Sequence, residues 1–295
     1  MRLGIDFGTT RTVVAFCDRG NYPVLRFTAE DHDALDGIPT IVAARDGELR
    51  YGLDAVAVRG DRSWTLVRSF KSALAGDGGL ERKLDVAGTE VRLFDLVVGF
   101  LEHVRDAILT RSNLPKSLRE DPTMRVVVAT PANALGTQRF LTLEAFRRAG
   151  FEVVSTLNEP SAAGFEYTHA HRSTITSRRE LVVVYDLGGG TFDASLVRVT
   201  DLKHDAVVTG GVTRLGGDDF DEALLALVAA RRGAPSAAER TAWLEACREA
   251  KERLGPSSRK IVVELDDEEV TLPLSEYYEA CAPLVERTIE AMLPV

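Results

Sequence analysis

Two short segments of the chain are rich in glycine and threonine, residue types that suit phosphate binding. Each segment follows a stretch of apolar residues. The candidate phosphate-binding residues are Gly8, Thr9, Thr10, Gly188, Gly189, Gly190 and Thr191. Glycine brings backbone N–H groups close to a ligand because it has no Cβ, and it adopts positive φ without strain. Threonine adds a hydroxyl donor. The two segments therefore predict two phosphate-binding loops.

An aspartate precedes each loop, Asp6 in the first half of the chain and Asp186 in the second. A carboxylate repels phosphate, and two unit charges 4 Å apart cost about 4 kcal/mol even at an effective dielectric of about 20. A divalent cation removes this conflict, because Mg²⁺ keeps several waters and takes one or two carboxylates together with phosphate oxygens. We therefore expect Asp6 and Asp186 to hold Mg²⁺ through water, and the ligand to be ATP or ADP.

A run of three glycines is also compatible with a plain tight hairpin. The same order of residues, an apolar strand, an aspartate, a Gly/Thr-rich loop and a second strand, occurs twice along the chain. This recurrence favours phosphate binding over the hairpin interpretation and suggests two similar lobes. The chain contains neither GxxxxGK[ST] nor GxGxxG, which argues against a P-loop and against a dinucleotide site.

The composition sets the broad class of the protein. Hydrophobic residues make up 45% of the chain and charged residues 27%, a composition typical of a globular protein. At 295 residues the chain is long enough for two domains or lobes. The net charge of −9 does not indicate binding to nucleic acid or to an anionic membrane. Three cysteines without a CxxC pair argue against a disulfide framework, and no signal peptide is evident, so we expect a cytoplasmic protein.

Hydrophobic periodicity predicts an α/β chain with a partly parallel sheet. Helices are expected at Leu93–Arg111, Thr137–Ala149, Ser161–Thr168, Asp219–Arg231, Ala237–Leu254 and Ser275–Met292. Strands are expected at Leu3–Phe7, Thr12–Cys17, Val24–Phe27, Arg125–Thr130, Phe151–Leu157, Leu181–Tyr185, Phe192–Val199, Asp205–Val212, Lys260–Leu265 and Val270–Leu274. A turn is expected at Asn158-Glu159-Pro160, where Pro160 suits the first turn of the following helix.

Four segments resemble the nucleotide-binding domain of the Hsp70 chaperones, within the actin, sugar-kinase and Hsp70 superfamily. They are IDFGTT at Ile5–Thr10, NEPSAAGFEY at Asn158–Tyr167, YDLGGGTFDASL at Tyr185–Leu196 and LGGDDFD at Leu215–Asp221. Weaker matches are Ala129–Ala132 with Gln138 and Arg139, and Ser69–Lys71. The resemblance covers essentially the whole chain in order. It implies an α/β fold of the two-lobed, actin-like ATPase type (ribonuclease H-like), with the C-terminal part missing.

The resemblance also implies a division into lobes. Lobe I is expected over residues 1–174, with an outer subdomain over about 30–107, and lobe II over residues 175–295. Within lobe II, residues 175–213 would be an incomplete inner part and 214–295 the outer subdomain. ATP and Mg²⁺ are expected between the lobes. An adenosine-binding loop and closing helices would follow Val295, so we expect a truncated domain.

Roles for individual residues follow from the same resemblance. The catalytic residues are expected to be Lys71, Glu159, Asp186, Thr191 and Asp193. Lys71 would lie by the γ-phosphate and position the attacking water, while Glu159 and Asp193 would orient water near the metal. Judged without the resemblance, Lys71 would be interpreted as a solvated surface lysine. Further nucleotide contacts are expected from Gly216, Gly217, Asp218 and Lys251. Pro131 and Arg139 would relay the state of the nucleotide to the surface.

The resemblance implies ATP hydrolysis that drives the conformational cycle of a chaperone. The implied partners are a J-domain cochaperone and a nucleotide exchange factor, with unfolded peptide bound only through a C-terminal domain that this sequence lacks. We expect a monomer, with no nucleic-acid or membrane partner. An actin-like filament protein and a small-molecule kinase would share the phosphate loops; LGGDDFD argues against the filament, and whether these 295 residues hydrolyse ATP by themselves stays open.

The chain departs from the family pattern at two places besides its end. Arg248, Glu252 and Gly255 stand where the chaperones usually carry Glu, Arg and Ser beside the adenine. This charge swap either preserves a local ion pair or weakens stacking on the base. Arg11 follows the threonines where a small polar or aromatic residue is usual, and its side chain reaches either a phosphate or solvent.

Overall fold

The structure, a computed structural model, describes most of the chain. The described residues are 1–29, 34–61, 63–76, 78–86, 88–120, 123–132, 134–171, 180–200, 203–236, 239–265 and 268–295. The chain divides into two compact units, Met1–Val182 with Val197–Val207, and Val183–Leu196 with Val208–Val295. The lobe boundary expected between residues 174 and 175 lies outside the described residues, and the division into lobes and subdomains stays a prediction.

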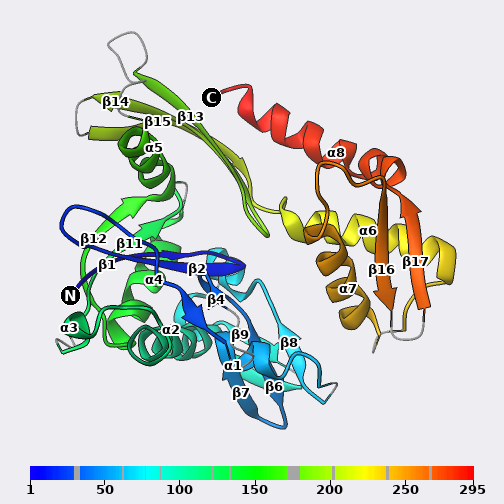
Figure 1. Cartoon of the computed structure of the whole chain (residues 1–295), viewed down its shortest axis with the longest axis horizontal. Helices are drawn as coiled ribbons and strands as arrows, with labels where there is room; N and C mark the ends of the chain where they lie inside the picture. The colour runs from blue at the N-terminus through cyan, green and yellow to red at the C-terminus, as the bar shows by residue number, and fades with distance from the viewer. Residues whose placement is uncertain are drawn as a thin grey trace. The chain divides into compact units, whose positions relative to one another are not determined.

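A mixed sheet forms the framework of the first unit (Figure 1). Its strand order is β12-β11-β1-β2-β5, with bounds Glu152–Asn158, Arg125–Thr130, Arg2–Phe7, Arg11–Phe16 and Ile38–Pro39. Strand β1 runs parallel to β11 and antiparallel to β2, and β11 runs parallel to β12. In β1 every second residue is buried, so Asp6 points to the face opposite the core residues Ile5 and Phe7.

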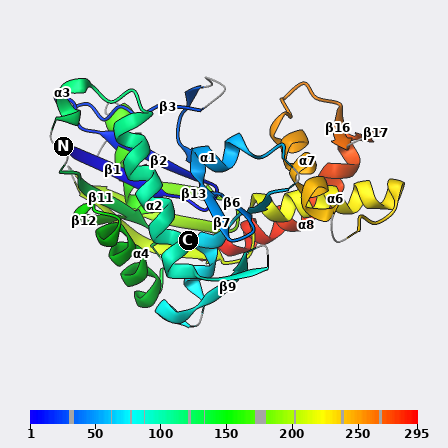
Figure 2. The ribbon, with the colours of Figure 1, turned by 90° about the horizontal axis from the view of Figure 1, so that it is seen from below.

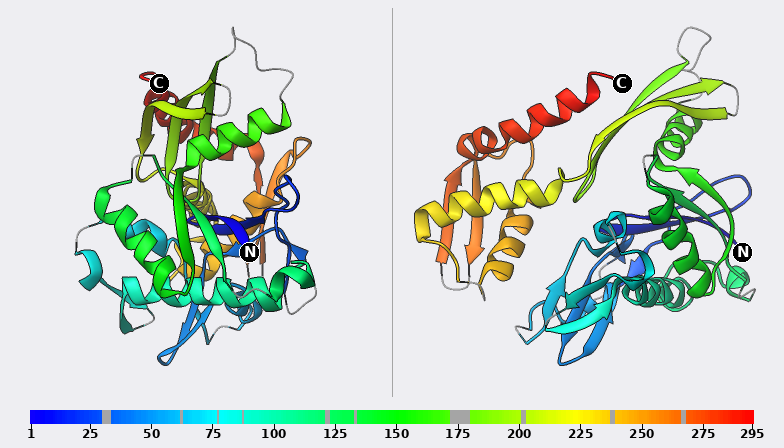
Figure 3. Two further views of the ribbon diagram at one scale, coloured as in Figure 1. Left: turned by 90° about the vertical axis from the view of Figure 1, so that its left-hand side faces the viewer. Right: turned by 180° about the vertical axis from the view of Figure 1, so that it is seen from behind.

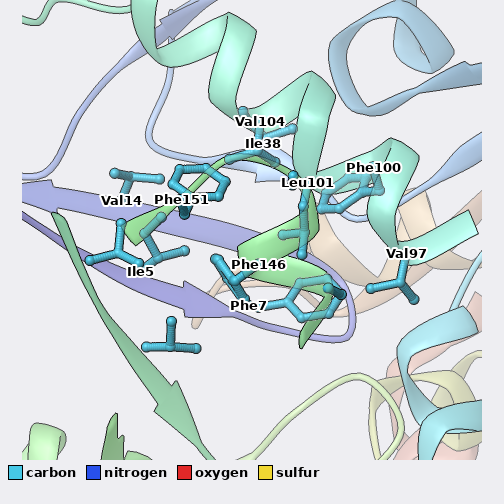
Figure 4. Close-up of a cluster of buried hydrophobic side chains, with 14 of the residues drawn as sticks. Ile5, Phe7, Val14, Ile38, Val97, Phe100, Leu101, Val104, Phe146 and Phe151 are labelled. Atoms are coloured by element: carbon cyan, nitrogen blue, oxygen red, sulfur yellow. The ribbon is translucent and has the colours of Figure 1, made fainter. Parts of the chain in front are cut away.

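Aliphatic and aromatic side chains together form the core on one face of this sheet (Figure 4). Helix α2 (Leu93–Thr110) crosses the strands, as Figure 2 shows, and it packs against α4 (Gly136–Arg148). The ring of Phe7 lies 5.8 Å from that of Phe100 on α2 and 6.3 Å from that of Phe146 on α4. Strand β1, which leads into the first glycine loop, is therefore held in place by the packing of Phe7 against two fully buried rings.

Smaller elements complete the first unit. They are β3 (Phe27–Thr28), β4 (Ala34–Leu35), β6 (Val42–Arg45), β7 (Glu48–Tyr51), α1 (Gly52–Ala57), β8 (Thr65–Val67), the 3₁₀ helices η1 (Phe70–Ala75) and η2 (Gly79–Glu81), β9 (Lys83–Val86), β10 (Thr89–Arg92), α3 (Lys116–Arg119) and α5 (Glu159–Ala170). Strands pair in the orders β7-β6-β8, β10-β9 and β3-β4. Helix α5 contacts β11 and β12.

The second unit is built around an antiparallel hairpin of β16 (Lys260–Leu265) and β17 (Glu268–Pro273). Helices α6 (Gly217–Arg232) and α7 (Arg240–Glu252) pack against each other, and α8 (Leu274–Met292) contacts both strands (Figure 3). The buried core between them includes Leu224, Trp243, Cys247 and Val263. Burial raises the pKa of the Cys247 thiol to about 12, which makes it an inert packing residue.

The second glycine loop lies in a sheet of order β13-β14-β15. Their bounds are Leu181–Leu187, Phe192–Thr200 and Lys203–Val212. The segment 183–196, which contains the loop, belongs to the second unit. None of the helices in the described part of the chain is long and apolar enough to cross a membrane.

Most expected elements are found within one or two residues of their predicted bounds, and two expectations are wrong. The segment Val24–Phe27 is not a full strand, because its pairing with β2 is limited to the bridge at Val24 and the backbone N–H of Arg26 donates to Asn113 Oδ1 instead. The turn expected at Asn158-Glu159-Pro160 is absent. Strand β12 runs to Asn158, and α5 begins directly at Glu159, with proline in its first turn as expected.

A mostly buried histidine, with a side chain 11% exposed, caps the short helix α1 in the first unit. Leu53 N–H donates to His103 Nε2 at 3.1 Å, and His103 Nδ1 lies 3.5 Å from Asp54 Oδ2. Burial lowers the pKa of His103, with Arg111 acting in the same direction while Asp54 and Asp106 oppose it. The nitrogen that accepts from Leu53 must be unprotonated, so the neutral imidazole is the form that fits this site.

This cap predicts a loss of stability in weak acid. Because the folded pKa of His103 is below the unfolded value of about 6.5, the unfolded chain binds a proton more readily, and stability falls as pH drops through and below about 6.5. We expect the urea midpoint to decrease from pH 7.5 to pH 5.5. His103→Gln keeps an acceptor without a titrating ring and should flatten this decrease; an equally steep decrease in that variant would contradict the assignment. His103→Ala should cost about 1–3 kcal/mol at neutral pH.

Candidate functional site

The first glycine loop is a tight connection between β1 and β2. Gly8 N–H donates to the carbonyl oxygen of Arg11 at 3.1 Å, which leaves Thr9 and Thr10 as the two central residues of the turn. A Cβ on Gly8 would lie 2.4 Å from that same oxygen, so glycine is required here. Thr40 N–H donates to the carbonyl of Thr10 at 2.9 Å and holds the tip of the loop.

The second glycine loop has the same closing hydrogen bond. Gly188 N–H donates to the carbonyl oxygen of Thr191 at 2.9 Å, with Gly189 and Gly190 as the central residues. The two loops, which the sequence presents as a repeat, thus share the same short connection between adjacent strands, β1–β2 and β13–β14.

The central N–H groups of both loops have no protein acceptor among the residues that the structure describes. This holds for Thr9 and Thr10 in the first loop and for Gly189 and Gly190 in the second. All four residues are partly buried. In a partly buried residue, an N–H group without an acceptor is unfavourable unless a ligand or water accepts from it, and neighbouring backbone donors suit the oxygens of a phosphate. The donor chemistry of both loops therefore fits a phosphorylated ligand.

Lys71 and Glu159, both expected to be catalytic, meet in the first unit. Lys71 lies on η1 and is only 7% exposed, so the interpretation as a solvated surface lysine is wrong. Its Nζ lies 3.5 Å from Glu159 Oε1 and 5.4 Å from the centre of the Phe7 ring. Phe7 is the residue after Asp6 in the sequence. Within the part of the chain that the structure describes, the 3.5 Å approach to Glu159 is a loose contact, and a buried ammonium so paired is suited to receive a second anionic partner.

Local structure holds Lys71 from both sides. Before it, Phe70 inserts its ring into the core, 5.6 Å from Phe100. Ser69 adopts the left-handed conformation, with φ at 54°, a strained state for a residue with a Cβ. After it, Arg82 Nη1 donates to the carbonyl of Ala73 at 2.7 Å. Core packing and this capping arginine therefore fix the short helix that carries the lysine.

The two expected relay residues also lie together. Arg139 Nη2 is 3.5 Å from the carbonyl oxygen of Pro131 and 3.4 Å from Asn158 Oδ1. These long contacts join α4 to the end of β11 and to the residue that precedes Glu159. Their role in signalling stays a prediction.

The LGGDDFD segment supports the second loop from behind. Gly217 N–H donates to the carbonyl of Gly188 at 2.9 Å, and Asp218 N–H donates to that of Gly189 at 2.7 Å. A Cβ on Gly216 would lie 2.4 Å from the Gly189 carbonyl oxygen, so the two backbones touch. The first N–H groups of α6, which lack partners inside the helix, are thus satisfied by the loop itself.

Lys251 lies behind the same loop and bonds to it. Its Nζ donates to the carbonyl of Gly217 at 2.8 Å and forms a 2.6 Å ion pair with Asp221 Oδ1. Asp221 is only 3% exposed, and burial raises the pKa of its carboxyl although Lys251 and Arg248 oppose the shift. Sequence reasoning missed Asp221 as a site residue; its signal is a carboxylate on the apolar face of α6, beside the buried Leu224 and Leu225.

The positions that depart from the family pattern have definite surroundings. Arg248 Nε lies 3.1 Å from Glu252 Oε1, so the charge swap preserves a local ion pair. The alternative, weaker stacking on the base, stays a prediction. The aliphatic part of Arg11 packs over Gly37, where a Cβ would meet its Cγ and Cδ at 2.9 Å. Within the described ranges the exposed Arg11 forms no ion pair, and its role stays open.

The expected metal ligands do not form a ready-made cage. Asp6 and Asp186 are exposed and belong to different units, and Asp193 on β14 is partly buried. Among the described residues no group of three or more His, Cys, Asp or Glu side chains could hold a metal ion. A cation that keeps most of its waters needs only one or two carboxylates, which fits exposed aspartates better than a closed site.

Comparisons with known proteins match most or all of the chain. A family model described as "Hsp70 protein" matches residues 104–295. The "Chaperone protein HscA homolog" of Bordetella pertussis is 32% identical over 99% of this chain and 48% of its own length. The homolog of Variovorax paradoxus is 33% identical over 98% of this chain and 48% of its own length. "Chaperone protein HscA" of Cronobacter sakazakii is 29% identical over 97% of this chain and 47% of its own length. The chain spans about half the length of these relatives.

Proposed function

The chain belongs to the Hsp70 family, and we propose that it binds ATP through its two glycine loops and hydrolyses the terminal phosphate. Its fold is the α/β fold of the actin-like ATPases in this family, as predicted from the sequence. The observation that carries the proposal is that both loops contain partly buried residues whose N–H groups have no protein acceptor among the described residues. Phosphate oxygens would satisfy these donors.

The loops and their neighbours divide the binding task. The N–H groups of Thr9, Thr10, Gly189 and Gly190 donate to phosphate oxygens, and the Thr191 hydroxyl adds a donor. As part of this proposal, Gly216, Gly217, Asp218 and Lys251 contribute beside the second loop. When bound, Mg²⁺ supplies positive charge against the phosphates, and Asp6 and Asp186 would hold it through its water ligands.

Lys71 and Glu159 account for hydrolysis. The Lys71 ammonium offsets charge on the transferred phosphoryl group, and its burial strengthens that effect because water screens it poorly. The Glu159 carboxylate, 3.5 Å from this ammonium, accepts a hydrogen bond from the attacking water and orients it. Asp193 assists in orienting water. Positioning and electrostatics supply most of the catalysis in phosphoryl transfer, so no covalent step on the protein is needed.

In the whole protein, we propose that hydrolysis drives a chaperone cycle. A J-domain cochaperone and an exchange factor would act on this domain, and unfolded peptide would bind elsewhere in the longer chain. Pro131 and Arg139 would carry the nucleotide state outward through the contact between them. Two alternatives remain as outcomes of the tests below: an actin-like filament and a small-molecule kinase.

Calorimetry with ATP, ADP and AMP tests the binding proposal. We expect ATP and ADP to bind in the presence of Mg²⁺ and AMP to bind at least tenfold more weakly, because the loops contact the phosphates beyond the first. EDTA should weaken the binding of ATP. Equal affinity for AMP and ATP, or no binding of ATP at all, would overturn the proposal.

Two further measurements separate the classes of activity. Phosphate release without an added acceptor is expected of an ATPase, whereas a kinase would need a substrate hydroxyl. Sedimentation should give one small species with and without ATP. ATP-dependent pelleting would instead favour the filament.

A further inference from the structure

We infer that Asp221 is a positioning residue, which holds the second glycine loop in place through Lys251 and Gly217. The inference rests on the proposed function insofar as that loop binds nucleotide, but the contacts themselves belong to one unit of the ligand-free chain. Three contacts follow one another. The buried Asp221 carboxylate pairs with the Lys251 ammonium, the ammonium donates to the Gly217 carbonyl, and Gly217 N–H donates to Gly188 of the loop.

Each contact is short and partly shielded from solvent. Asp221 Oδ1 and Lys251 Nζ are 2.6 Å apart, with side-chain exposures of 4% and 21%. The carboxylate serves Lys251 as a counter-ion, while the ammonium directs a hydrogen bond of 2.8 Å to the Gly217 carbonyl. Gly217 N–H then donates to Gly188 at 2.9 Å. A charged donor strengthens such a bond, and burial strengthens it further.

The geometry explains why a buried carboxylate is needed at this point. Without a counter-ion, a mostly buried ammonium would be drawn toward water, and the Gly217 carbonyl would lose its charged donor. Gly216 and Gly217 have no side chains that could anchor them. The Gly217 backbone is therefore held between Lys251 on one side and Gly188 on the other. The position of loop 188–190 therefore depends on α6 and α7 as well as on its own closing hydrogen bond.

Hydrogen exchange in the ligand-free chain tests this directly. Asp221→Asn keeps the shape of the side chain and removes its charge. We expect the amides of Gly217 and Asp218 to exchange roughly tenfold faster or more, because the Gly217 carbonyl loses a charged hydrogen-bond donor. Amides of the β16–β17 hairpin should exchange at the wild-type rate. Unchanged exchange at 217 and 218, or an equal loss of protection in the hairpin, would overturn the inference.

A matched control and a second variant guard against misfolding. Glu222→Gln, at the next position of α6, removes an exposed pair with Arg240 and should leave loop exchange unchanged. The double variant Asp221→Asn/Lys251→Met removes both charges and leaves none buried without a partner. It should unfold near the wild-type midpoint and still show fast exchange at Gly217; wild-type protection there would overturn the inference.

Kinetics distinguish a positioning role from a general loss of structure. In Asp221→Asn we expect the KM for ATP to rise about tenfold and kcat to change less than threefold, because Lys71 and Glu159 lie in the other unit. A roughly tenfold fall in kcat with an unchanged KM would contradict the inference. If the wild-type chain binds no ATP, the proposed function fails, while the exchange experiment still decides whether Asp221 holds the loop.

Discussion

Replacing Lys71 with methionine is expected to lower the rate of phosphate release from ATP by a factor of about 100 to 1,000, the usual effect of removing one preorganised electrostatic group. Methionine fills the space of the buried side chain, which is 7% exposed, and removes only its charge. The backbone donors of the two loops are untouched. Affinity for ATP should therefore fall by less than tenfold, and single-turnover hydrolysis with calorimetry would measure both effects.

A matched control is available on the same unit. Lys83 lies on β9 with a side chain 53% exposed and pairs with Glu90 at the surface. Lys83→Met should leave both hydrolysis and affinity unchanged, because an exposed pair contributes little. Hydrolysis at the wild-type rate in Lys71→Met would remove this residue from the mechanism. A loss of affinity as large as the loss of rate would assign it to binding alone.

Replacing Gly216 with alanine is expected to destabilise the second unit by about 1–3 kcal/mol and to weaken ATP binding at least tenfold. The added Cβ would lie 2.4 Å from the Gly189 carbonyl oxygen, 2.5 Å from its carbon and 2.6 Å from Gly190 N. These are backbone atoms of the loop that presents the unpaired N–H groups. The loop must move to admit the methyl group, so the damage falls on phosphate binding.

Two other glycines of the unit provide graded controls. A Cβ on Gly217 would lie 3.3 Å from Lys251 Nζ, a wider approach than the 2.4 Å contact with backbone at Gly216, so Gly217→Ala should have a smaller effect. Gly255 has open space around its Cβ position, and Gly255→Ala should change stability by less than about 0.5 kcal/mol. Urea unfolding and calorimetry would rank the three variants. Equal effects at Gly216 and Gly255 would show that the close approach of the two backbones does not matter.

The loops and most of the elements around them could be predicted because their signals are local. An apolar strand followed by Gly8-Thr9-Thr10 or by three glycines specifies a tight connection wherever it occurs, and helical periodicity predicted α2, α4 and α8 within one or two residues. The strand expected at Val24–Phe27 was wrong because a distant side chain intervenes. The Asn113 carboxamide ends the pairing that Val24 begins, and sequence spacing contains no sign of it.

The candidate site shows the same division. Residue type identified the two glycine loops, whereas Lys71 and Glu159 were predicted from the family resemblance alone. Burial of Lys71 against Phe7, and its 3.5 Å approach to Glu159, required a 3₁₀ helix to be fixed by core packing. The sequence does not single out Asp221, because an aspartate in a helix is ordinarily exposed. Only the packing of α6 against α7 buries it beside Lys251.

The sequence by itself determined which backbone segments are free of side chains and able to present N–H groups to phosphate, since that depends on residue type and immediate neighbours. Only the tertiary structure decided which charged side chains are buried near those segments and which of them form ion pairs. The burial of a charged group and the identity of its ion-pair partner depend on residues far apart in the chain, such as Asp221 and Lys251 or Lys71 and Glu159. Those distances exist only after the strands and helices have packed.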